Sequence, residues 1–251
     1  MISRRRLFTL ASSAVASSAC SAWAQRSPST DGRLSVSLKP PTRTTAPGTQ
    51  ALGLGSSSGR DGLLIVPASY RPETATPMAV MLHGAGGSAR RVTSLFSVAD
   101  ELGIIIFSPE SRGGTWDGIR DRYGPDVSFL NLSLASVFDR CNVDSRRLAI
   151  GGFSDGASYG LSIGLANGDL FTHIVACSPG FIIQPGATRG RPRIFISHGK
   201  ADRILPIDST SRTIVPVLEQ GGYAVKYREF EGPHAVPPEI AREALTWFVG
   251  K

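Results

Sequence analysis

The chain has 251 residues, of which 41% are hydrophobic, and this is enough to bury the core of one sizeable domain. Its formal net charge of +7 is carried by the first 60 residues, so that residues 61–251 are neutral as a whole. A domain that binds nucleic acid carries its basic excess on its folded part. This distribution therefore argues against nucleic acid as a partner.

The first 24 residues are typical of an export signal. Three arginines at positions 4–6 precede an apolar stretch of small residues at 7–22, and Ala22-Trp23-Ala24 fits a cleavage site. The arginine run resembles a twin-arginine signal, with an ordinary secretory leader as the alternative. No later segment approaches the ~20 consecutive apolar residues of a membrane span. We expect an exported protein, periplasmic or secreted, that is not inserted in a membrane.

Residues 25–60 are rich in Ser, Thr, Pro and Gly, a composition that favours loops. Within them Leu34, Val36 and Leu38 alternate with polar residues, as the residues of an edge strand do. We predict a short flexible start followed by an N-terminal hairpin.

From residue 61 onward, apolar strand-like runs alternate with helix-like segments. Strands are predicted at 62–66, 79–82, 104–108, 147–151, 173–177, 193–197 and 225–230, and helices at 88–102, 126–140, 154–166, 208–220 and 238–249. This order predicts an α/β fold for residues 61–251, with one doubly wound, mostly parallel sheet and no large cap domain. Ligands of such sheets bind at the carboxyl ends of the strands.

The most informative motif is Gly152-Phe153-Ser154-Asp155-Gly156, which follows the apolar run at 148–150 and precedes a predicted helix. A G-x-S-x-G pattern between a strand and a helix is a nucleophile elbow, which exposes a serine hydroxyl above the end of the strand. The turn is so tight that only small residues fit two positions before and after the serine. Gly152 and Gly156 meet this demand, and Ser154 is therefore predicted to be a nucleophile.

A serine nucleophile needs an imidazole base and an acid that orients the imidazole. After Ser154, Asp202 follows the predicted strand at 193–197, and His234 follows the strand at 225–230. All three side chains are expected at one rim of the parallel sheet. Asp208 is the nearest alternative acid, but its position fits the N-cap of the next helix.

The oxyanion that develops during acyl transfer needs preorganised N–H donors. One is predicted at Asp155, directly after the serine. The other is predicted in the glycine-rich loop at 82–87, with Ala85 as the first choice and Gly86 as the alternative. His83 in this loop is interpreted as structural. The loop lacks the lysine and hydroxyl of a phosphate-binding Walker A motif.

Together these motifs resemble the phospholipase/carboxylesterase and polyhydroxybutyrate-depolymerase-like esterases of the α/β-hydrolase superfamily, over residues 61–249. The segments that carry the resemblance are 82–87, 111–117, 124–129, 152–156, 198–202 and 232–234. The resemblance implies a catalytic triad of Ser154, Asp202 and His234. It also implies that Ala85 is an oxyanion donor and that Trp116 forms a wall of the substrate pocket, with packing in the core as the equal alternative for this tryptophan.

The chain departs from these esterases at Asp155, where Gln, Ala or Asn is usual. Only the backbone N–H of this residue is required for catalysis, so the charge bears on substrate preference alone. We expect a serine esterase that hydrolyses small-molecule carboxylic esters without a cofactor or a metal. A lysophospholipase or thioesterase, and a catalytically silent binding protein, are the alternatives. Cys141 and Cys177 are too few for a usual zinc site, and a disulfide between them stays open, as does the oligomeric state.

Overall fold

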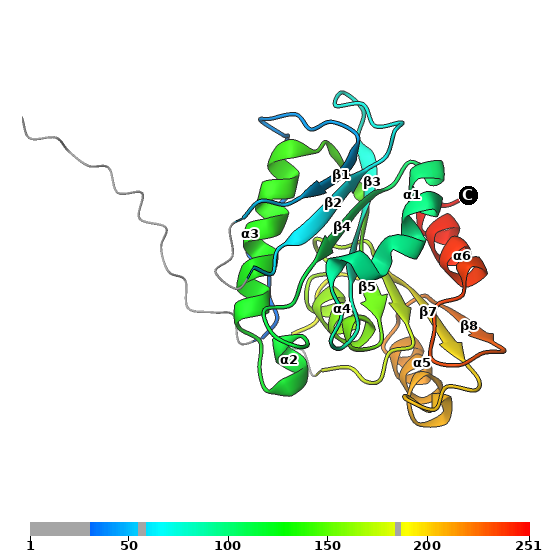
Figure 1. Cartoon of the computed structure of the whole chain (residues 1–251). Coiled ribbons are helices and arrows are strands. Elements are labelled where there is room, and N and C mark those ends of the chain that lie inside the picture. The colour runs from blue at the N-terminus through cyan, green and yellow to red at the C-terminus, as the bar shows by residue number, and fades with distance from the viewer. Residues whose placement is uncertain (1–30, 55–58, 184–186) are drawn as a thin grey trace, which may run out of the picture.

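One eight-stranded sheet forms the centre of the computed structural model, which describes residues 31–54, 59–183 and 187–251 (Figure 1). The strands are β1 (Gly48–Ala51), β2 (Gly62–Val66), β3 (Thr76–Leu82), β4 (Ile105–Pro109), β5 (Val143–Phe153), β6 (His173–Cys177), β7 (Arg193–Gly199) and β8 (Val225–Phe230). Their order in the sheet is β1-β2-β4-β3-β5-β6-β7-β8. The pairs β1·β2 and β2·β4 are antiparallel and all others are parallel. The predicted α/β fold with a mostly parallel sheet is confirmed.

Helices cover both faces of this sheet (Figure 1). The helical elements are η1 (Ala89–Leu95), α1 (Phe96–Leu102), α2 (Asp117–Arg120), α3 (Pro125–Arg140), α4 (Asp155–Ala166), η2 (Ile207–Ser209), α5 (Ser211–Gln220) and α6 (Pro238–Val249). Residues of α3, α4 and α5 join one buried apolar cluster, and residues of η1, α1 and α6 join the other. Central strands such as β4 are apolar throughout because they are buried on both faces. Within the three described ranges, no helix is both long and apolar enough to cross a membrane.

Two predicted helices differ from the observed elements. The segment predicted as one helix at 88–102 divides into the 3-10 turn η1 and the helix α1. The segment at 208–220 begins with η2, and the N-cap of α5 is Thr210. Asp208 is therefore not that N-cap. Its carboxylate instead accepts a hydrogen bond from Arg212 at 2.6 Å.

The predicted edge strand at 34–38 is wrong. The N–H of Leu34 donates to the side-chain oxygen of Asn167 (2.8 Å), and the N–H of Val36 donates to that of Asn131 (3.0 Å). Leu34 is buried in the core, and Val36 packs against it. The alternation arises because every second side chain faces the core, whereas the backbone binds helix side chains instead of a strand. The N-terminal hairpin exists, but its first strand is β1. The predicted export signal at 1–24 lies outside the described residues and stays a prediction.

Cys141 and Cys177 are both buried free thiols. Burial raises the pKa of Cys141 to about 12 and that of Cys177 to about 11, so both thiols are neutral near pH 7. The disulfide that the sequence left open does not join them. Among the described residues, no group of three or more His, Cys, Asp or Glu side chains is placed to hold a metal ion.

His173 on β6 makes the stability of the fold sensitive to acid. Its ring is buried against Trp247 and Phe248 of α6, with ring centroids 5.3 and 5.2 Å away. Burial first, and then the charge of Arg193, lower the pKa of His173 to about 4. In the unfolded chain His173 has the ordinary pKa of 6.5 and binds a proton below that pH. In the folded chain it stays unprotonated until the pH approaches 4. The contribution of the neutral His173 ring to the free energy of unfolding is therefore fully present above pH 6.5, and it is lost as the pH falls towards 4.

We expect the free energy of unfolding to fall by roughly 3 kcal/mol between pH 7 and pH 4 because of His173 alone. Urea denaturation at both pH values would measure it, with His173→Phe as the comparison. Thr172 Oγ1 loses its contact with His173 Nδ1 in that variant but keeps its hydrogen bonds with the backbone of Leu148. The substitution therefore leaves this hydroxyl with hydrogen-bond partners. The variant should lose about 3 kcal/mol less than the wild type on acidification. An equal loss in both proteins would contradict the assignment.

Candidate active site

Ser154 occupies the turn between β5 and α4 in a strained backbone conformation, with φ 57° and ψ −121°. Its N–H donates to the carbonyl of Cys177 at 3.0 Å. A Cβ atom added at Gly152 or at Gly156 would lie 2.3 Å from the carbonyl oxygen of Leu82. Both positions therefore require glycine, and the nucleophile elbow predicted from the sequence is present. Left-handed backbone at a non-glycine residue is a feature of functional sites.

The ends of three strands bring the predicted triad residues together. Ser154 follows β5, Asp202 lies in the turn after β7, and His234 lies in the turn after β8. The distance from His234 Nε2 to Ser154 Oγ is 2.9 Å, and that from His234 Nδ1 to the Asp202 carboxylate is 2.5 Å. Ser154 and Asp202 are buried, whereas the His234 side chain keeps 14% of its surface exposed. The geometry thus provides a continuous hydrogen-bonded chain from acid to hydroxyl.

The turns that carry Asp202 and His234 pack directly on each other. The N–H of Lys200 donates to the carbonyl of Phe230 (2.9 Å), and that of Ala201 donates to Gly232 (3.0 Å). A Cβ atom at Gly199 would lie 2.4 Å from the Gly232 carbonyl oxygen. These bonds extend the parallel pairing of β7 and β8 beyond the sheet, and they hold the acid and the imidazole at hydrogen-bonding distance.

The Asp202 carboxylate is held in its ionised form by donors on both oxygens. One oxygen accepts the N–H groups of Ile204 (2.9 Å) and Leu205 (2.8 Å). Burial acts to raise the pKa of Asp202, but the bonds from Leu205, His234 and Ile204 outweigh it and lower the pKa below its usual value. An ionised Asp202 can orient the His234 ring and stabilise its cation.

His198 also touches the Asp202 carboxylate, and sequence reasoning missed it. Its Nε2 lies 3.1 Å from Asp202 and 2.8 Å from the carbonyl of Leu205. Both partners are acceptors, so this nitrogen carries the proton. Burial lowers the pKa of His198 and keeps the ring neutral. The available signal was its position four residues before Asp202, at the end of a strand.

The two predicted oxyanion donors belong to segments that adjoin Ser154. Asp155 is the first residue of α4, where backbone N–H groups have no partner inside the helix. A Cβ atom at Gly84 would lie 3.3 Å from Ser154 Cβ, so the loop that contains Ala85 passes close to the serine. The Gly86 N–H donates to the Gly114 carbonyl at 2.7 Å, which disfavours Gly86 as the alternative donor. The Ala85 N–H has no hydrogen-bond partner within the described residues.

Trp116 is not placed as a wall of an open pocket. It is fully buried, and its indole donates to the backbone carbonyl of His83 at 2.9 Å. Its ring stacks on Tyr159 with centroids 5.3 Å apart. Trp116 is thus a packing residue, and its indole N–H holds the backbone where the loop after β3 begins. One residue earlier, Thr115 donates to the Asp155 carboxylate at 2.6 Å, which holds that charge against the loop after β4.

A mainly apolar cavity of about 230 Å³, whose lining also includes Arg91, adjoins the elbow. Its walls include Gly152, Phe153, Cys177 and Val236, together with residues of η1 and α6. The Phe153 ring also faces the His234 ring, with centroids 4.6 Å apart. A larger cavity, of about 680 Å³, lies around α2 and is lined by charged residues such as Arg112 and Arg120. Neither cavity is lined by a triad residue, but the smaller one is lined by Gly152 and Phe153, the two residues that precede Ser154.

The sheet, the elbow and the Ser–His–Asp arrangement are those of the α/β-hydrolase fold. The sequence model of the family described as phospholipase/carboxylesterase matches residues 131–247. Feruloyl esterase C of Emericella nidulans is 26% identical over 166 residues, which cover 62% of this chain and 60% of that protein. The candidate esterase NocK of Nocardia uniformis subsp. tsuyamanensis is 25% identical over 193 residues, which cover 64% of this chain and 56% of NocK.

Solved structures agree in fold. A phospholipase/carboxylesterase from Dyadobacter fermentans has a TM-score of 0.58 at 23% identity, and the match covers 76% of this chain and 97% of that structure. The fluorophosphonate-binding serine hydrolase FphF from Staphylococcus aureus has a TM-score of 0.63 at 15% identity, with 82% and 100% covered. These matches make the chain similar to esterases that have the α/β-hydrolase fold. The chain spans less than two thirds of the length of the curated relatives it matches.

Proposed function

We propose that this protein hydrolyses carboxylic esters through a covalent acyl-enzyme on Ser154. The observation that carries the proposal is the hydrogen-bonded chain from Asp202 through His234 to Ser154 Oγ, at 2.5 and 2.9 Å. A serine hydroxyl becomes a useful nucleophile only when a base stands ready to take its proton. The similarity of the chain to the phospholipase/carboxylesterase family model and to a feruloyl esterase supports the same reaction class.

In the proposed mechanism, Ser154 Oγ attacks the ester carbonyl while His234 Nε2 takes the hydroxyl proton. Asp202 keeps the other ring nitrogen protonated and stabilises the imidazolium. The N–H groups of Asp155 and Ala85 bind the oxyanion of the tetrahedral intermediate. His234 then protonates the leaving alcohol, and an acyl-serine remains. Water, activated by His234, repeats the sequence and releases the acid.

The cavity beside the elbow favours esters with a modest apolar acyl group. Its volume of about 230 Å³ and its walls of Phe153, Cys177 and Val236 suit a short or medium acyl chain better than a polar one. We therefore expect turnover of p-nitrophenyl esters to be highest for acetate to octanoate and to fall towards palmitate. Initial rates across that series would measure the preference.

A fluorophosphonate probe would test the nucleophile independently of the choice of ester. We expect stoichiometric labelling of the wild type, with the modified peptide containing Ser154. Absence of both labelling and hydrolysis would contradict the proposed function and favour a silent binding protein. Labelling at Ser154 together with an optimum at palmitate, or on acyl thioesters, would instead favour the lysophospholipase or thioesterase alternative.

A further inference from the structure

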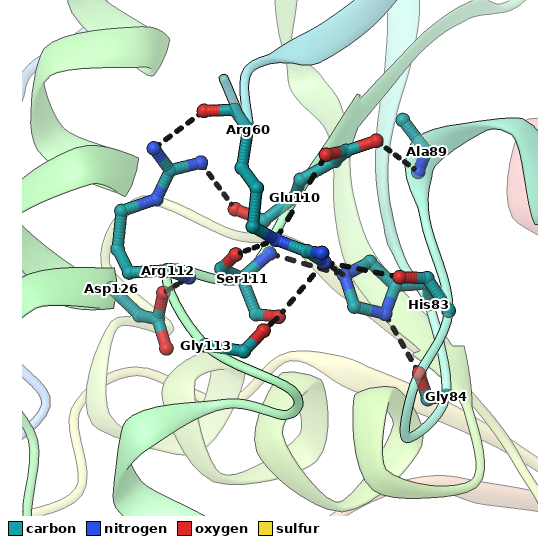
Figure 2. A network of polar contacts seen from close by, with 10 residues as sticks. Arg60, His83, Gly84, Ala89, Glu110, Ser111, Arg112, Gly113 and Asp126 are labelled. Carbon is teal, nitrogen blue, oxygen red and sulfur yellow. Dashed lines mark hydrogen bonds and ion pairs between the residues drawn. The ribbon is translucent and has the colours of Figure 1, made fainter. Parts of the chain in front are cut away.

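A polar network beside the loop after β3 centres on Arg60, which precedes β2 (Figure 2). The Arg60 guanidinium donates from Nε to the carbonyl of Ser111 (2.5 Å) and from Nη2 to the carbonyl of Gly87 (3.0 Å). Ser111 lies in the loop after β4, and Gly87 lies in the loop after β3 that carries Ala85. Arg60 therefore ties together two loops that leave neighbouring strands.

These contacts determine which nitrogen of His83 carries its proton. The Nε2 atom of His83 lies 3.1 Å from the N–H of Ser111 and 3.5 Å from Nη2 of Arg60. Both of these groups are donors only, so Nε2 must accept and the proton must reside on Nδ1. Burial lowers the pKa of His83, which keeps the ring neutral. The Nδ1–H then donates to the carbonyl of Gly84 at 2.7 Å (Figure 2).

The bond from His83 orients the peptide group that contains the oxyanion donor. The Gly84 carbonyl also accepts the N–H of Gly87 at 3.0 Å, so it is held from two directions. This carbonyl and the N–H of Ala85 belong to one planar trans peptide, and they therefore point in opposite directions. Holding the carbonyl towards His83 turns the Ala85 N–H away from His83. Gly84 itself passes close to Ser154.

Arg60 is itself held from several sides. Glu110 Oε2 lies 4.0 Å from Arg60 Nε, and the other Glu110 oxygen accepts the N–H of Ala89 at 3.1 Å. The backbone carbonyl of Arg60 accepts a bond from Arg112 at 2.6 Å. The Arg60 side chain is 29% exposed, so its charge is partly withdrawn from water and compensated by Glu110. Such a fork-shaped donor, bound to two backbone carbonyls, is well suited to fix loop geometry.

We propose that Arg60 is a positioning residue of the oxyanion hole, acting through Ser111, Gly87 and His83 on the peptide that carries the Ala85 N–H. The inference rests on the proposed function, in which Ala85 binds the oxyanion. It assigns a role in the reaction to a residue within the segment 25–60, which the sequence analysis placed before the α/β domain.

The test compares Arg60→Met in the full chain with Arg43→Met as the matched control. Arg43 belongs to the same N-terminal segment, but it pairs with Asp139 on the surface of α3. We expect Arg60→Met to lower kcat for p-nitrophenyl butyrate by about 10- to 100-fold with KM nearly unchanged. This is less than the loss of ~10²–10³ for removal of a whole oxyanion donor, because the donor remains but is held less well. Arg60→Lys should be intermediate and Arg43→Met unaffected.

A transition-state analogue separates positioning from a general structural effect. The Ki of a trifluoromethyl ketone should rise in Arg60→Met by the same factor by which kcat/KM falls. A kcat within twofold of wild type, or a rise in KM alone, would overturn the proposal. A nitrogen NMR spectrum of the imidazole groups in the wild type is a test that does not depend on the folding of a variant. It should show the His83 proton on Nδ1. A proton on Nε2 would overturn the proposal.

The outcomes distinguish this inference from the proposed function. An active wild type, labelled at Ser154, with an unaffected Arg60→Met variant overturns the role of Arg60 alone. A wild type without turnover or labelling overturns the proposed function, and the role of Arg60 with it.

Discussion

Replacement of Ser154 by alanine is expected to lower kcat for ester hydrolysis by about 10⁶-fold. The variant loses the hydroxyl oxygen that lies 2.9 Å from His234 Nε2, so no acyl-enzyme can form on this residue. The backbone strain at this position is shared by alanine, and we expect the melting temperature to change little. Initial rates on p-nitrophenyl butyrate and a thermal melt would measure both quantities.

Two further variants make this result specific. Ser128→Ala removes an exposed serine hydroxyl on α3 and should retain wild-type turnover. The double variant Ser154→Ala with His234→Ala should be no slower than Ser154→Ala alone, because residues of a triad act as one unit. Wild-type turnover in Ser154→Ala, or a further loss in the double variant, would contradict the mechanism.

Substitution of Gly156 by alanine is expected to destabilise the fold by about 3 kcal/mol and to lower the melting temperature by roughly 6–12 °C. The added Cβ would lie 2.3 Å from the carbonyl oxygen of Leu82 and 2.5 Å from that of His83. Both obstacles are backbone, so neither can move aside as a flexible side chain would. The first turn of α4 must shift away from β3, and the loop with Ala85 must follow. Turnover should therefore fall together with stability.

The matched control for this variant is Gly114→Ala. A Cβ atom at Gly114 would meet nothing within 4 Å, although its carbonyl binds the same loop through Gly86. The melting temperatures of the two variants should therefore differ by the whole shift that we expect from the clash at Gly156. A Gly156→Ala protein as stable as Gly114→Ala would show that the elbow can relax at little cost.

Most elements of the sheet and its helices follow from the sequence. The bounds predicted for β2, β6, β8 and α6 are the observed ones. Strands buried on both faces form continuous apolar runs, and such runs stand out from the polar segments between them. Helix beginnings were less certain, as at η1 and η2, because a 3-10 turn and the first turn of an α-helix use similar residues.

The neighbourhood of the candidate site could also be predicted. Ser154, Asp202 and His234 each follow a strand, and in a parallel sheet the carboxyl ends of the strands meet at one rim. The pattern of strands and their order in the chain thus predicted which side chains lie near one another. The hydrogen-bond distances depend on how the turns after β7 and β8 pack, and only the tertiary structure decided them. The contact of His198 with Asp202 depends on the same packing.

The sequence by itself determined the α/β architecture, the nucleophile elbow and the residues of the Ser–Asp–His set, because all of these depend on short-range pattern and on chain order. The tertiary structure decided the burial of Trp116, the partners of the segment at 34–38 and the place of Arg60 beside the loop after β3. Arg60 and the Ser111 carbonyl are 51 residues apart in the chain. A hydrogen bond between such distant groups exists only after the sheet has brought their loops together, and no local pattern encodes it.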